Sequence, residues 1–151
     1  MRKYGHLRWL ALALALLLPL GAGAQEVVHE TALYIADIAL ETPEEFSQLL
    51  DRAEQLLLAG VNIPREQSQV SFVLHGPVLN TLLRGNYLDN KRLVDLAASL
   101  SAMRVIELKA CRTWMSSNGI QDAQLLPFVE TVDYAPKAVR ALVRDESRIY
   151  F

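Results

Sequence analysis

The chain has 151 residues, and its 15 Lys and Arg side chains stand against 17 Asp and Glu, a formal net charge of −2. This balance, with no basic cluster, argues against binding to nucleic acid or to an anionic membrane surface. The chain has one cysteine, which excludes an internal disulfide, so an apolar core has to hold the fold together.

Residues 1–24 have the features of a secretory signal peptide. Arg2, Lys3 and Arg8 make a positive start, residues 9–20 form an apolar stretch, and residues 22–24 (AGA) offer a cleavage site before Gln25. An uncleaved N-terminal anchor is the alternative, but the apolar stretch is short for a span of about 20 residues. We expect cleavage after Ala24 and a periplasmic or secreted protein with no membrane contact afterwards.

The expected mature chain, residues 25–151, suits a single domain with its own core. The leader holds three of the 15 basic side chains and no acidic one, which leaves 12 against 17 and a net charge of −5. An unpaired thiol in an oxidising compartment is a liability unless it is buried, paired between chains or used. This consideration favours a functional role for Cys111.

Short apolar segments alternate with helical patterns along the mature chain, as in βαβ units. Thr42, Pro43 and Glu45 mark a helix start with a capping box. We predict a three-layer α/β/α domain with a mainly parallel sheet of about five strands. The predicted strands span residues 32–36, 70–75, 105–111, 128–132 and 148–151, and the predicted helices start near residues 43, 78, 90, 112 and 136.

Cys111 stands where the third predicted strand ends and a helix begins. In an open α/β sheet, the carboxyl ends of the strands are where ligands and chemistry collect. A thiol at a helix start also has its anion stabilised by free N–H groups and by the helix dipole. We therefore expect Cys111 to titrate below the ordinary thiol pKa of about 8.5. The alternative is a buried structural cysteine that packs as a small apolar side chain.

Three further residues are candidates for the same site. His75 closes the second predicted strand and could face one crevice with Cys111, although a loop carbonyl could equally satisfy it. Lys109 shares the strand face of Cys111 and Arg112 begins the next helix, so both could stabilise a thiolate, or both could simply be solvated. No third orienting residue is evident, so a Cys-His hydrolase has little support.

The sequence gives no indication of a metal or a cofactor. The mature chain offers only His29, His75 and Cys111 as soft ligands, without the close spacing of a zinc site. There is no phosphate-binding glycine loop, and a lone cysteine cannot support thioredoxin-type redox cycling.

Four segments together resemble the DsrE/DsrF family of small sulfur-relay proteins. They are residues 72–77 (FVLHGP), residues 111–120 (CRTWMSSNGI), in which a glycine follows the cysteine by eight positions, residues 126–129 (LPFV) and residues 147–151 (SRIYF). The resemblance covers residues 69–151, whereas residues 25–68 match the family less clearly and the expected export departs from its usual cytoplasmic setting. It implies a flavodoxin-like domain, a homo-oligomer (trimer or hexamer) and a persulfide-carrying cysteine at position 111.

The resulting prediction is an exported sulfur carrier that takes sulfane sulfur on Cys111 from a donor protein and passes it to an acceptor protein, both unknown. The alternative is a non-catalytic oligomeric binding module of the same fold with a structural cysteine. Because one helical turn cannot bury both Trp114 and Met115 beneath one sheet face, we expect one of them at a subunit interface or at the partner-docking rim beside Cys111. Burial of Trp114 in the core is the alternative.

Overall fold

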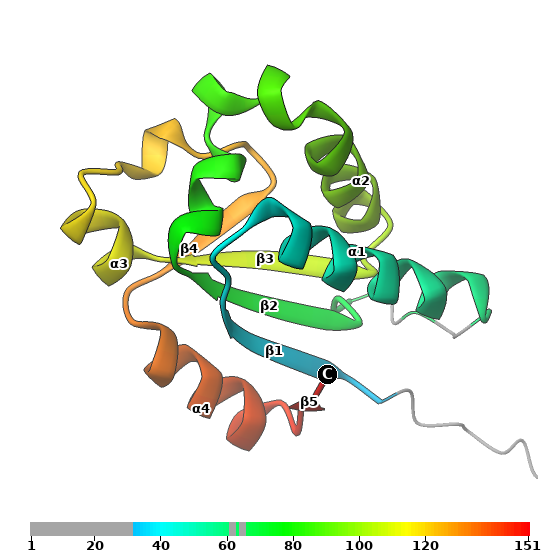
Figure 1. The fold of residues 1–151 in the computed structure, drawn as a ribbon. Helices are drawn as coiled ribbons and strands as arrows, with labels where there is room; N and C mark the ends of the chain where they lie inside the picture. Colours follow the sequence, from blue (N-terminus) through cyan, green and yellow to red (C-terminus); the bar gives the residue numbers. More distant parts are fainter. Residues whose placement is uncertain (1–31, 61–62, 64–65) are drawn as a thin grey trace, which may run out of the picture.

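The computed structural model describes residues 32–60, 63 and 66–151, drawn in colour in Figure 1. The predicted signal peptide, its cleavage site and residues 25–31 lie outside the described residues. The described chain folds as a sheet with helices on both sides.

The sheet has five strands in the order β4-β3-β2-β1-β5, and every neighbouring pair is parallel. The predicted fold class, a three-layer α/β/α domain with a parallel sheet, is confirmed. β2 lies at the centre and is buried along almost its whole length, as expected for a strand covered on both faces. The strands are β1 (Tyr34–Ala39), β2 (Val70–His75), β3 (Ile106–Cys111), β4 (Val129–Val132) and β5 (Ile149–Tyr150).

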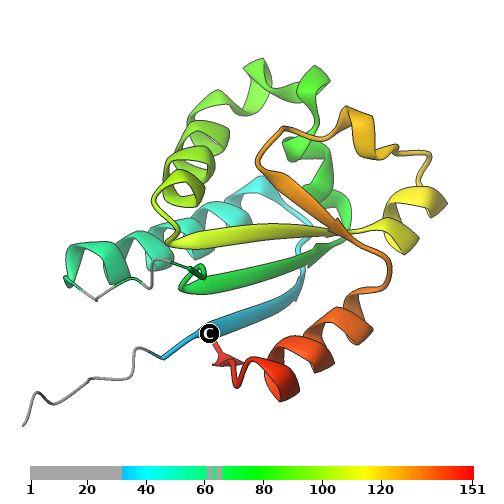
Figure 2. The ribbon, with the colours of Figure 1, turned by 180° about the vertical axis from the view of Figure 1, so that it is seen from behind.

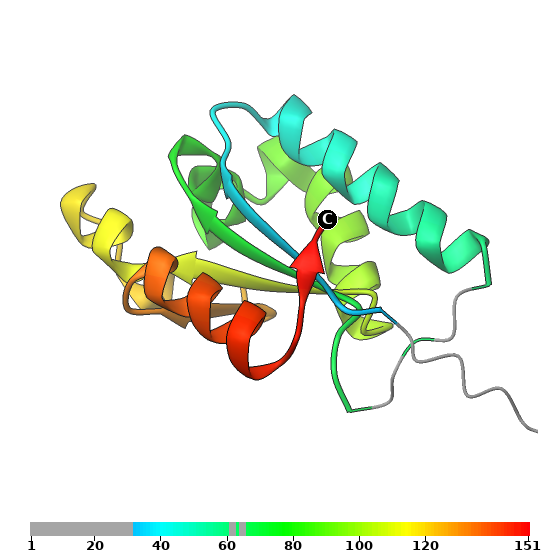
Figure 3. The ribbon, with the colours of Figure 1, turned by 90° about the horizontal axis from the view of Figure 1, so that it is seen from below.

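The two faces of the sheet are covered by different helices (Figures 1 and 3). Helices α1 (Pro43–Leu58) and α2 (Lys91–Ala102) lie on one face, and α4 (Ala135–Asp145) lies on the other, where its contacts are mainly with β1 and β2. The short helix α3 (Arg112–Ser117) lies at the carboxyl end of the sheet. Four 3-10 turns complete the described chain, namely η1 (Pro77–Leu82), η2 (Arg84–Asn86), η3 (Leu88–Asn90) and η4 (Asp122–Gln124).

The start of α1 follows directly from its sequence. The Thr42 hydroxyl accepts a hydrogen bond from the Glu45 N–H at 3.3 Å, and the Glu45 carboxylate accepts one from the Thr42 N–H at 3.2 Å. This is the predicted capping box, with Pro43 in the first helical turn, where its missing N–H costs nothing. Gly60 follows the helix with a φ of +70°, a conformation that glycine adopts without strain.

The core consists of two apolar clusters, one on each face of the sheet. The larger cluster fills the space under α1, α2 and η1, and includes Phe46, Phe72 and Leu108. The smaller one lies under α4 and comprises six buried residues: Ile35, Val73, Cys111, Ala135, Val139 and Leu142.

The first strand begins and ends later than the predicted residues 32–36. The predicted strand stops before Asp37, but β1 continues to Ala39 because its backbone pairs with β2 as far as His75, the register partner of Ala39. The polar Asp37 side chain lies at an exposed position of the strand. The other strands agree with their predicted ranges to within two residues.

Candidate functional site

Cys111 lies at the point where the connections of two neighbouring strands leave the sheet on opposite sides. After β3 the chain passes through α3 and η4 on the α1 side, where Leu126 N–H donates to the Leu82 carbonyl at 2.9 Å (Figure 2). After β4 the chain crosses to α4 on the other side (Figure 3). Such a divergence is where open α/β sheets bind ligands, and Cys111 pairs in register with Val132 at this point.

Cys111 is buried, which is the environment of the structural-cysteine alternative. Its exposed fraction is 4%, and its side chain belongs to the apolar cluster under α4. The strand does end at Cys111 and α3 does begin at Arg112, as predicted. The cover comes from α4, because Ala135 and Val139 in its first turns share the Cys111 cluster.

His75 lies beside Cys111, as predicted from the sequence. Leu74 pairs in register with Ala110, so the next residues along the two parallel strands, His75 and Cys111, lie level with each other. Neighbouring strands are about 4.8 Å apart, and level residues point to the same face. The imidazole, however, faces Asp37, with Nε2 at 3.4 Å from Oδ1, so its recorded polar partner is a carboxylate on β1 rather than the thiol.

Arg112 joins the two diverging connections. Its Nη2 lies 2.7 Å from Asp122 and its Nη1 lies 2.9 Å from Asp133. Hydrogen bonds to Asp122 and then to Asp133 raise the pKa of the guanidinium, and the same contact with Arg112 lowers the pKa of Asp122. Arg112 therefore connects the segment before β4 to the segment after it.

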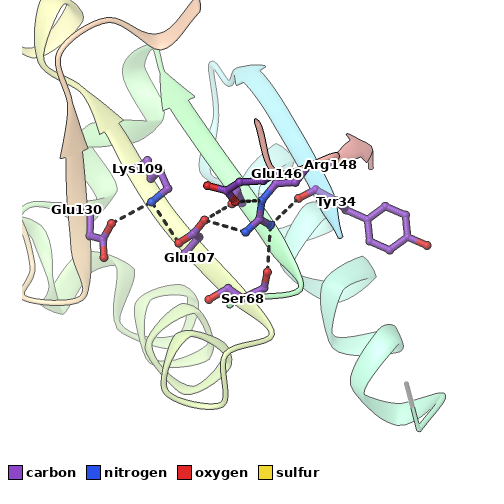
Figure 4. A network of polar contacts seen from close by, with 8 residues as sticks. Tyr34, Ser68, Glu107, Lys109, Glu130, Glu146 and Arg148 are labelled. Atoms are coloured by element: carbon purple, nitrogen blue, oxygen red, sulfur yellow. Dashed lines mark hydrogen bonds and ion pairs between the residues drawn. The ribbon is translucent and has the colours of Figure 1, made fainter. Parts of the chain in front are cut away.

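Lys109 shares the sheet face of Cys111, but its ammonium is held elsewhere (Figure 4). Nζ lies 3.1 Å from Glu107 and 3.0 Å from Glu130, and its side chain is only 16% exposed. Burial alone would lower the pKa of Lys109, but the two carboxylates outweigh it and raise the pKa. Among the described residues, Lys109 and Arg112 make their polar contacts with carboxylates and not with the Cys111 sulfur. The predicted role of both as thiolate stabilisers has no direct contact to support it.

A buried arginine, Arg148, which no sequence pattern predicted, lies at the other end of this face. Arg148 is 3% exposed and donates to the carbonyls of Ser68 at 3.0 Å and Tyr34 at 3.2 Å. Its Nε binds Glu146 at 2.8 Å and its Nη2 lies 3.5 Å from Glu107, which links it to Lys109 (Figure 4). A cavity of about 500 Å³ borders this network. The charges are paired with one another and with carbonyls, so the network ties β5 to the rest of the sheet.

Of the two α3 residues expected to compete for burial, Met115 is the buried one, so the predicted interface or docking rim rests on Trp114. Met115 is 1% exposed and packs in the larger cluster, whereas Trp114 is half-buried and contacts both clusters. α3 lies at the end of the sheet, so its side chains reach both faces. Trp114 keeps some exposed surface near Cys111.

Metal binding and membrane spanning were considered for the described residues, 32–60, 63 and 66–151. Within these residues, no three His, Cys, Asp or Glu side chains gather as a metal site would require. No helix among them has the length and apolar character needed to cross a membrane.

Comparison with known proteins supports the fold. No family model matches the chain, and no curated protein matches it. The chain is similar to the solved structure of MTH1491, a protein of unknown function from Methanobacterium thermoautotrophicum, with a TM-score of 0.62 and 16% sequence identity. The match covers 80% of this chain and 97% of that chain. At this identity the likeness shows the fold alone.

Proposed function

We propose that this protein is an exported sulfur carrier of the DsrE type, with Cys111 as the acceptor of sulfane sulfur. The observation that carries the proposal is the place of Cys111, at the end of β3 where the connections after β3 and β4 diverge. The sequence resemblance in residues 72–77 and 111–120 is the reason for assigning persulfide chemistry to this position.

A single thiol is enough for this task. The Cys111 thiolate attacks the outer sulfur of a donor persulfide, the donor's S–S bond breaks, and the donor leaves as a thiolate. An acceptor thiolate later attacks the outer sulfur on Cys111 and releases the Cys111 thiolate, so neither step needs an oxidant or a second cysteine. A redox cycle that ends in an intramolecular disulfide would need two cysteines, and the chain has one.

The burial of Cys111 sets a condition on this function. At 4% exposure the sulfur is not open to a donor protein, and reactive cysteines are ordinarily partly exposed. A carrier built on this fold must uncover Cys111 when it loads and when it unloads.

The same burial favours a second function, a non-catalytic oligomeric binding module with a structural cysteine. In that case Cys111 contributes only to packing, together with Val73 and Val139. Both functions include a homo-oligomer, a trimer or hexamer, with Trp114 at or near the interface. Sedimentation of residues 25–151 at micromolar concentration tests the assembly, and a monomer would contradict it.

Intact-mass measurement of the protein, purified without reductant, tests the carrier. We expect an added mass of about 32 Da, one sulfur atom, that dithiothreitol removes and that Cys111→Ser lacks. His75→Gln serves as the matched variant, since it changes the neighbouring strand and leaves the thiol in place. An adduct that persists in Cys111→Ser, or unmodified mass in every preparation, would favour the binding module.

A further inference from the structure

The link between β4 and α4 passes beside the thiol. The chain leaves β4 at Val132, the register partner of Cys111, and enters α4 at Ala135, a member of the Cys111 cluster. Residues 133 and 134 therefore join two neighbours of Cys111. We call residues 133–135 the strap.

The strap is fastened to the start of α3 by a few polar contacts. The Asp133 carbonyl accepts hydrogen bonds from the Thr113 hydroxyl at 2.7 Å and from the Thr113 N–H at 3.2 Å. The Asp133 carboxylate accepts one from Arg112 Nη1 at 2.9 Å. All three donors belong to the two residues that follow Cys111.

These fastenings lie at the surface, unlike the packing beneath them. The Asp133 side chain is 86% exposed, and Tyr134, the residue before α4, makes no side-chain capping bond. Segments held by few, solvent-accessible hydrogen bonds open at much lower cost than the whole domain. The Arg112 and Thr113 contacts thus fasten the exposed part of the strap, residues 133 and 134, next to Ala135, which packs against Cys111.

We propose that the strap is a latch, fastened by Thr113 and Arg112, whose local opening uncovers Cys111. Opening of the latch would give a sulfur donor the access to Cys111 that the proposed carrier function requires. The latch itself is inferred from the contacts above, and only its biological role rests on the proposed function. When the latch opens, the first turn of α4 moves away from the end of β3 while the larger cluster stays packed. A sulfur donor then reaches a thiol that the resting protein keeps covered.

Native-state labelling of Cys111 with iodoacetamide, followed by intact mass, tests the latch. Thr113→Val removes the hydroxyl donor with little change of shape, and Asp133→Asn weakens the Arg112 contact. Since each lost hydrogen bond contributes about 1 kcal/mol, we expect each variant to label several-fold faster than wild type and the double variant roughly tenfold faster or more. Ser117→Ala is the matched control, because it removes the hydrogen bond from Ser117 to the Thr113 carbonyl within α3 and leaves the strap intact.

The dependence on urea separates a latch from global unfolding. Local opening exposes little surface, so labelling at low urea should depend on urea far less than the unfolding equilibrium does. Labelling with the full urea dependence of unfolding would overturn the latch, and so would equal rates in wild type, Thr113→Val, Asp133→Asn and the double variant. Fast labelling of the latch variants without any persulfide would instead count against the carrier and leave the latch standing.

Discussion

Replacing Arg148 with methionine should destabilise the domain more than any change at a surface charge. Arg148 is 3% exposed and makes four recorded contacts, to the Ser68 and Tyr34 carbonyls, to Glu146 and to Glu107. Methionine fills much of the same volume but leaves the two carbonyls without their donor and Glu107 without one of its two cations. The variant therefore isolates the polar network from simple loss of packing.

The size of the effect follows from what remains after the substitution. Breaking a buried ion pair from one side costs about 3–5 kcal/mol. The lower end applies here, because Glu107 keeps Lys109 and a hydrogen bond from Ser71, and the partly exposed Glu146 is able to hydrate. A loss of about 3 kcal/mol is a large share of the 5–15 kcal/mol typical of a whole domain.

Urea unfolding, followed by tryptophan fluorescence or circular dichroism, measures this loss. With a slope of about 1.5 kcal/mol per molar urea, the midpoint should fall by roughly 2 M. Arg144→Met is the matched control, since Arg144 forms an exposed pair with the adjacent Asp145 and should leave the midpoint unchanged. If Arg148→Met loses less than about 1 kcal/mol, the network is not a buried, paired structure and the reasoning fails.

Three other changes have defined outcomes. Gly76→Ala should cost about 1–3 kcal/mol in urea unfolding, because φ is +108° and a Cβ there would lie 2.9 Å from the Leu40 carbonyl oxygen; an unchanged midpoint would show that the turn adapts. Met115→Ala should cost about 2–5 kcal/mol as a core truncation, whereas a near-zero cost would mean that Met115 is not packed in the core. The hydrogen bond from Arg112 lowers the pKa of Asp122, so Asp122 stabilises the fold above its unfolded pKa near 3.9, and this stability is lost as the pH falls through the lower folded value. Urea midpoints between about pH 2 and pH 6 should therefore fall less steeply on the acid side in Asp122→Asn than in wild type, and parallel curves would contradict this.

Local sequence signals predicted the elements well. The capping box at Thr42 and Glu45, the strand that ends at Cys111 and the parallel order of the sheet all follow from short patterns with direct physical causes. A strand buried on both faces has to be apolar, and β2 shows this in its own residues. The fold class was therefore within reach of the sequence.

The environment of Cys111 could not be predicted from the sequence, because it depends on residues far along the chain. Ala135 and Val139 reach the thiol only after β4 has been added next to β3 and the chain has crossed to the other face. The same holds for Arg148, which approaches Glu107 only because β5 returns to the far edge beside β1. The sequence gave no sign that Arg148 is buried, since arginine is ordinarily exposed.

Loading of the folded protein with sulfur tests the central claim most directly. Residues 25–151, reduced and freed of reductant, are mixed with inorganic polysulfide under native conditions and measured by intact mass. The carrier predicts one added sulfur of about 32 Da on Cys111 in the folded protein and none in Cys111→Ser. An adduct that forms only once urea has unfolded the chain would show that Cys111 is a structural residue and would contradict the proposed function.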